Sequence, residues 1–168
     1  FETGKVAQAK ADFEKANALS ANNKTIKNNL GAVELINGNV KEAEVLFGAA
    51  TGAGDEVNYN KGIVAIKSGD YAAAVNYFGQ CNCVNAALAN VLAGNNNEAL
   101  KKLNAENKEC PMSYYLKAVI GARTNDATAV IENLRKACSL DGSFKQLAAT
   151  DMEFAKFFEN NDFIAITK

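Results

Sequence analysis

The sequence predicts an all-α fold, a right-handed α-α superhelix in which helical hairpins stack as a solenoid. A short turn recurs along the 168 residues, at Gly4, Gly38, Gly69, Gly94 and Asn125. Nine residues after each turn stands a large apolar residue: Phe13, Phe47, Phe78, Leu103 and Leu134. Mostly small residues follow each turn at five and twelve positions, and anchors at these three spacings share one helix face. Each turn is therefore predicted to open the second helix of a hairpin.

The hairpins are expected in the following order. A half repeat at residues 1–22 contributes a second helix, at 5–19. Four complete hairpins are predicted next, at 23–52 (helices 24–37 and 40–51), 55–81 (55–68 and 71–81), 83–106 (83–93 and 96–105) and 111–139 (111–124 and 126–139). The Phe-rich residues 141–168 are predicted to form C-terminal capping helices over the last stacking face. We expect one domain and, because it opens with half a repeat, interpret the chain as a segment of a longer protein.

These residues resemble the tetratricopeptide repeat family over positions 4–140. The match is carried by three sets, namely Leu30-Gly31 with Ala43, Phe47 and Ala50, then Gly62 with Ala74 and Phe78, and Ala9, Phe13 and Ala16 at the start. The chain departs from the family in the 25-residue step between Gly69 and Gly94, and in lacking the first-helix Trp and Tyr and the terminal Pro. A Sel1-like or other helical-hairpin solenoid is the near alternative. The resemblance implies a protein–protein interaction module.

Composition excludes several other classes of function. The formal net charge is −1 and the charged residues are scattered, which argues against nucleic acid and against an anionic membrane surface as partners. No apolar run approaches the length of a membrane span, so direct membrane insertion is not expected. The chain has no His, which removes the commonest general base and metal ligand. We therefore predict that it is not an enzyme and has no cofactor or metal site.

Four cysteines allow a different kind of chemistry. Cys81 and Cys83 form a CxC pair, and Cys110 and Cys138 stand apart, a spacing that lacks the close ligand pairs of structural zinc sites. Cys81 also fits a small buried position of the repeat. A Cys83–Cys110 disulfide is the predicted bond, with Cys81 as the alternative partner of Cys110. Either bond would indicate an oxidising compartment.

Binding residues are predicted on the first helices. Asn recurs two positions before the small residue in three successive hairpins, at Asn29, Asn60 and Asn85. An Asn side chain both donates and accepts, so such a row can pair with the backbone of an extended peptide, as the family resemblance also implies. The alternative is that these Asn residues bind water or stabilise neighbouring helices. The predicted contacts are Asn28, Asn29, Tyr59, Asn60, Asn85 and Tyr115.

The family's other known mode, a carboxylate clamp on Hsp70 or Hsp90 tails, is not expected. Its positions carry over to Asn28, Ala32, Tyr59, Ile63 and Tyr115, none of which is Lys or Arg. We predict a non-catalytic scaffold that binds an extended peptide or partner segment on its concave first-helix surface. The alternative is a structural spacer or assembly module of a larger bacterial envelope protein, self-associating through its terminal helices. A periplasmic or cell-envelope location is favoured over the cytoplasm, and the oligomeric state is left open.

Overall fold

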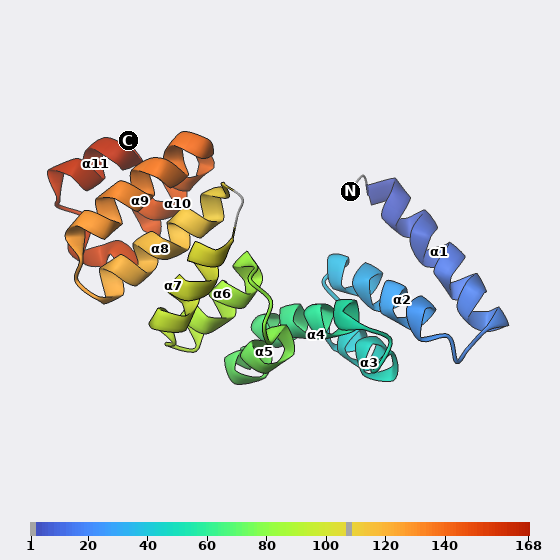
Figure 1. Cartoon of the computed structure of the whole chain (residues 1–168). Helices are drawn as coiled ribbons and strands as arrows, with labels where there is room; N and C mark the ends of the chain where they lie inside the picture. The colour runs from blue at the N-terminus through green and yellow to red at the C-terminus, as the bar shows by residue number, and fades with distance from the viewer. Residues whose placement is uncertain (1–2, 107–108) are drawn as a thin grey trace. The chain divides into compact units, whose positions relative to one another are not determined.

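A computed structural model describes residues 3–106 and 109–168, and every regular element in these ranges is a helix (Figure 1). The all-α fold class is therefore confirmed. None of the described helices is long and apolar enough to cross a membrane.

The chain forms two compact units, residues 1–79 and 80–168, where the sequence predicts one domain. Unit 1 contains α1 (Thr3–Leu19), α2 (Lys24–Ile36), α3 (Val40–Ala49), α4 (Asp55–Lys67) and α5 (Tyr71–Phe78). Unit 2 contains α6 (Val84–Leu92), α7 (Asn96–Ala105), α8 (Pro111–Arg123), α9 (Ala127–Leu140), α10 (Ser143–Thr150), the 3-10 helix η1 (Met152–Phe157) and α11 (Asn161–Thr167). Gly79 has a φ of +50°, so α5 ends at Phe78 rather than continuing to the predicted residue 81. The boundary between the two units lies directly after this helix end, between residues 79 and 80.

The recurring turn is the same helix-ending motif in all four hairpins. Gly38, Gly69, Gly94 and Asn125 have φ values of 84°, 80°, 80° and 58°, the left-handed region that glycine and asparagine tolerate best. In the first hairpin, Gly38 donates its backbone N–H to Leu35 O at 3.2 Å and Asn39 donates to Glu34 O at 2.9 Å. The other three turns repeat both bonds, which is the Schellman pattern that satisfies the last carbonyls of a helix. The turn positions in the sequence thus report a local backbone requirement.

In each hairpin of unit 1, a glycine of the first helix packs against a phenylalanine of the second helix. A Cβ added to Gly31 would lie 2.6 Å from Phe47 Cε1, and one added to Gly62 would lie 2.6 Å from Phe78 Cζ. The equivalent pairs in unit 2 are Ala87 with Leu103 and Ala118 with Leu134, all four of them buried in one apolar cluster. A smaller second-helix residue accompanies a larger first-helix residue, so close packing is kept with different side chains.

The aromatic end of the chain packs on the last hairpin. Phe144, Phe154, Phe157 and Phe163 are buried in the same cluster as Leu116 of α8 and Leu134 of α9. The ring of Phe154 lies 5.6 Å from the ring of Tyr115, nearly perpendicular to it. This packing buries the apolar stripe of α8 and α9 that would otherwise face solvent.

Candidate binding surface

Two of the predicted asparagines link the first helices of successive hairpins in unit 1. Asn60 Nδ2 on α4 donates to Asn28 Oδ1 on α2 at 2.9 Å. Asn28 is buried and Asn60 is half-buried. This bond uses part of the hydrogen-bonding capacity of each amide and fixes the register between α2 and α4.

A partly apolar surface lies beside this bond, which we name the first-helix surface of unit 1. It is formed on α2 by Asn29, Ala32 and Ile36, whose spacing of three and four residues places them on one face, and on α4 by Tyr59 and Ile63. Ile36 is 52% exposed and Tyr59 is 38% exposed, whereas the other three residues are half-buried. The Tyr59 ring lies 5.4 Å from that of Phe78, edge to face, and is thereby held in place.

Other predicted contacts lie elsewhere. Asn28 is 6% exposed and Tyr115 is 5% exposed, so the prediction of direct partner contacts is wrong for both. Asn28 is covered because it accepts the bond from Asn60, and Tyr115 because the C-terminal helices fold over α8. Asn85 is half-buried on α6 and belongs to unit 2, whereas Asn29 and Asn60 belong to unit 1.

Tyr115 is a core residue with a polar anchor. Its hydroxyl donates to Asp151 Oδ2 at 2.6 Å, and its ring lies 5.2 Å from that of Phe144. Burial, followed by the hydrogen bond to Asp151, raises the pKa of Tyr115 above its ordinary value. The neutral phenol therefore joins α8 to the C-terminal capping segment through its hydrogen bond to Asp151.

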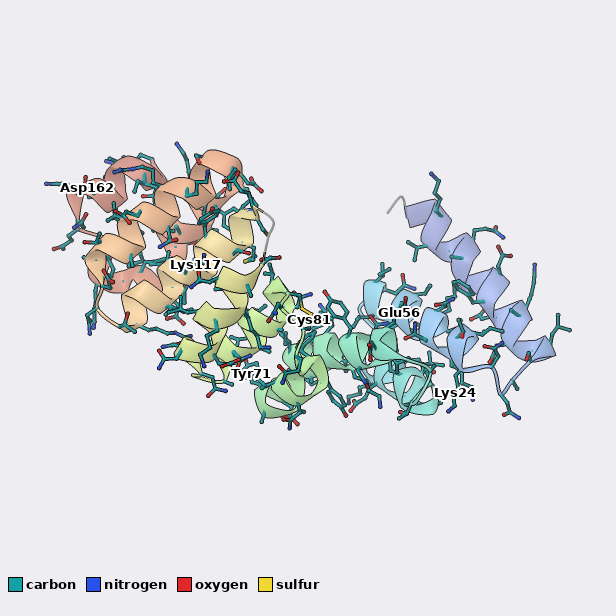
Figure 2. The ribbon with its side chains drawn as sticks, viewed as in Figure 1. Lys24, Glu56, Tyr71, Cys81, Lys117 and Asp162 are labelled. Carbon is teal, nitrogen blue, oxygen red and sulfur yellow. A yellow bond between two sulfur atoms is a disulfide. The ribbon has the colours of Figure 1, made fainter. Side chains whose placement is uncertain are left out.

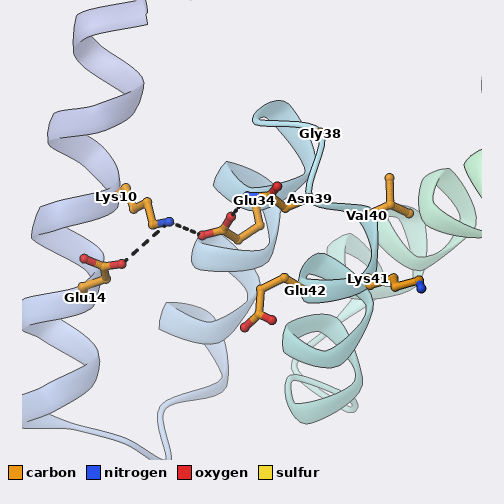
Figure 3. Close-up of a pocket in the computed structure, with 8 residues that line it drawn as sticks. All are labelled: Lys10, Glu14, Glu34, Gly38, Asn39, Val40, Lys41 and Glu42. Atoms are coloured by element: carbon orange, nitrogen blue, oxygen red, sulfur yellow. Dashed lines mark hydrogen bonds and ion pairs between the residues drawn. The ribbon is translucent and has the colours of Figure 1, made fainter.

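A cleft of about 730 Å³ opens among α1, α2 and α3 (Figure 3). Lys10 of α1 reaches Glu34 of α2, with Nζ 2.7 Å from Oε1, and Asn39 Nδ2 donates to Oε2 at 2.6 Å. The bond from Asn39 and the ion pair with Lys10 lower the pKa of Glu34, although burial opposes this. Both carboxylate oxygens are thus engaged, so this cluster joins α1 to α2.

The sequence contains a signal for this cluster in the residue that follows each turn and the residue five positions before it. Where the residue after the turn is Asn, the side chain five positions earlier is polar and buried, as in Glu34 with Asn39 and Asn90 with Asn95. Where that residue is Asp, its carboxylate caps the second helix instead. Asp70 accepts from Ala73 N, and Asp126 accepts from Ala129 N, at 2.9 Å each. The earlier position is then Ala65 or Gly121, which needs no partner.

The cysteines pair differently from the prediction. The disulfide joins Cys81 to Cys83, whose Cα atoms are 5.5 Å apart, and Cys110 and Cys138 are free (Figure 2). The predicted Cys83–Cys110 bond is therefore wrong. Because α5 ends at Phe78, Cys81 lies in the non-helical segment before α6, two residues from Cys83, which is the N-cap of α6. Within the described residues, no group of three or more Cys, Asp or Glu could hold a metal ion.

Comparison with known proteins identifies the class of fold. The family described as Tetratricopeptide repeat matches residues 55–82, which include α4 and α5. The crystal structure of YrrB, a TPR protein with an unusual peptide-binding site, is similar with a TM-score of 0.67 over 83% of this chain and 79% of YrrB. The sequence identity is 22%, so this likeness concerns the fold. No curated protein gives a match.

The chain is thus an all-α helical-repeat solenoid. The resemblance to the tetratricopeptide repeat family is confirmed, since residues 55–82 match that repeat and the fold is similar to that of a TPR protein.

Proposed function

We propose that the chain is a scaffold that binds an extended peptide segment on the first-helix surface of unit 1. The observation that carries this proposal is the pairing of Asn60 with Asn28, which holds two successive first helices side by side. Asn29, which is half-buried, follows Asn28 in α2, and Tyr59, which is 38% exposed, precedes Asn60 in α4. Amides of this kind pair with both N–H and C=O groups of an extended backbone.

Apolar residues along the same surface would add affinity. Ile36 is 52% exposed at the end of α2, and its position was not among the sequence-predicted contacts. A bound segment that covered Ile36 and the face of Tyr59 would bury apolar area beside the amides. Exposed aromatic and aliphatic side chains flanked by polar groups are typical anchors of such interfaces.

A displayed library of short random peptides, selected on the full chain, tests this proposal. Recovered peptides are synthesised and their affinities measured by fluorescence anisotropy for the wild type and for Asn29→Ala/Ile36→Glu. Neither substitution removes a group of the buried Asn28–Asn60 bond, so the hairpins should remain folded. Asn97→Ala/Leu147→Glu, at two exposed positions of unit 2, is the matched control.

The proposal expects affinity to fall at least about tenfold in the double variant and to be unchanged in the control. The assignment of this surface would be refuted if no recovered peptide bound the double variant more weakly than the wild type. Circular dichroism of each variant checks that helix content is retained.

We propose in addition that the protein functions in an oxidising compartment such as a periplasm or cell envelope. The Cys81–Cys83 disulfide supports this, since such bonds persist where thiols are not kept reduced. Alkylation of free thiols in intact cells, followed by mass determination, should find Cys81 and Cys83 unmodified before reduction. Complete alkylation of both would exclude this location.

A second candidate function is self-association through α1. Leu19 at the end of this helix is 90% exposed, and Phe13 and Ala16 are half-buried. Sedimentation equilibrium should then give a dimer that Leu19→Lys weakens. A monomer at all accessible concentrations would remove this alternative.

A further inference from the structure

A second hollow in unit 1 lies among the second helices α3 and α5 and the first helix α4. It has a volume of about 240 Å³ and is enclosed by α3, α4 and α5, with Gly48, Lys61 and Tyr77 among its lining residues. Val64 and Ala65 of α4 lie at its base and are 4% and 7% exposed. We name it the α3–α5 hollow. It shares no residue with the first-helix surface.

Gly48 is the residue of this hollow that its own chain does not explain. It lies within the last turn of α3 with helical backbone, and so does not use the left-handed freedom of glycine. A Cβ added there would meet no atom within 4 Å, unlike Gly31 and Gly62, which each face a phenyl ring. Glycine is a poor helix former, and this one makes no close packing contact of the kind seen at Gly31 and Gly62. Its bare Cα leaves room for the close approach of another backbone to α3.

An exposed aromatic side chain lines the hollow together with Gly48. Tyr77 of α5 is 41% exposed. The Tyr77 ring is held by Lys61, whose Nζ lies 5.5 Å from the ring centroid and also donates to Thr51 Oγ1 at 2.6 Å. The aromatic wall of the hollow is therefore fixed before any partner binds.

The charge of the lining indicates the kind of partner. Glu44 and Asp70 contribute two carboxylates, against the one ammonium of Lys61. Asp70 Oδ1 also caps α5 by accepting from Ala73 N, and Lys61 is engaged by Thr51 and Tyr77. Glu44 is exposed at the rim. The complementary ligand is therefore apolar where it enters the hollow and basic beside Glu44.

We propose that the α3–α5 hollow is a second protein-binding site, which takes an extended segment bearing an apolar side chain next to Lys or Arg. The segment's backbone lies over Gly48, its apolar side chain contacts Tyr77, and its basic group pairs with Glu44. This site is independent of the first-helix surface, and a chain with both can hold two segments at once.

Selection of displayed random peptides on the full-length Asn29→Ala/Ile36→Glu variant tests this site with the first surface disabled. The recovered peptides, made synthetically, should carry an apolar residue beside Lys or Arg. Their affinity should fall at least about tenfold for Gly48→Leu and about threefold or more for Glu44→Gln. Restoring Asn29 and Ile36 to the wild-type residues should leave these affinities unchanged.

Gly48→Ala separates binding from folding, because it should raise the melting temperature while weakening the same peptides. Failure to recover any peptide, or binding that Gly48→Leu does not alter, would overturn the proposal. Sedimentation velocity tests the other possible occupant of the hollow, a second copy of this chain. A dimer of this chain that Gly48→Leu dissociates would show that a second copy, rather than a peptide segment, occupies the hollow, and would also overturn it.

Discussion

Replacing Gly31 with Ala tests whether the close contact with Phe47 sets the geometry of a hairpin. The new Cβ would lie 2.6, 2.8 and 3.0 Å from three atoms of the Phe47 ring, which is fully buried and cannot swing into solvent. Overpacking of this kind costs about 1–3 kcal/mol. Alanine gains about 1 kcal/mol in helix propensity over glycine, so we expect a net loss of about 1 kcal/mol.

The double variant Gly31→Ala/Phe47→Leu isolates the clash. Phe47→Leu alone should cost about 1–2 kcal/mol, less than the 3–5 kcal/mol typical of Phe→Ala. With the ring gone, Ala at position 31 is accommodated, as Ala87 and Ala118 are beside Leu103 and Leu134 in unit 2. We expect a favourable coupling of about 1–2 kcal/mol between the two substitutions.

The assay is urea unfolding, with amide hydrogen exchange of α2 and α3 to report on unit 1 separately. Gly48→Ala is the matched control, because its Cβ meets no atom within 4 Å and should raise the unfolding free energy by up to about 1 kcal/mol. Additive effects in the double variant, or a stabilised Gly31→Ala, would refute the proposed role of the Gly31–Phe47 contact.

Three further predictions concern unit stability. Glu34→Gln should lower the unfolding free energy near neutral pH by about 1–3 kcal/mol. The lowered pKa of Glu34 in the folded state stabilises the fold at pH values above the ordinary value of 4.5. Urea titrations in acid should therefore show the wild type losing more stability than the variant as the pH falls. The raised pKa of Tyr115 stabilises the fold below its ordinary value of 10.0, so stability should decline as pH rises further, and Tyr115→Phe should remove that decline in alkaline unfolding curves. Ala74→Leu, at a fully buried site, should cost about 1–3 kcal/mol by overpacking, measured by thermal melts; an unchanged melt would contradict its place in the core.

The hairpins could be predicted from sequence because their determinants are local. The left-handed turn at Gly38 and the spacing to Phe47 are encoded within ten residues, and the same spacing recurs four more times. The binding surface was only partly predictable. Tyr115 matches Tyr59 in repeat position, yet it is buried by residues 36 positions further on, through Asp151.

Other features depend on partners distant in sequence or on one backbone angle. Glu34 is a charged residue on an inward face, and its burial depends on Lys10 in the preceding helix. The disulfide was mispaired because Gly79 ends α5 early and releases Cys81 from the position that the repeat predicts. The periodicity of the sequence alone predicts neither the burial of Glu34 nor the Cys81–Cys83 disulfide.

The central proposal is that a peptide segment binds along the first helices of unit 1. The most direct measurement is amide chemical-shift mapping of the isotope-labelled full chain during titration with the tightest peptide selected on the full-length Gly48→Leu variant, in which the α3–α5 hollow is blocked. The proposal predicts saturable shifts concentrated at Asn29, Ala32 and Ile36 of α2 and at Tyr59 and Ile63 of α4. Shifts confined to unit 2, or to α3 and α5 with this surface unaffected, would contradict it.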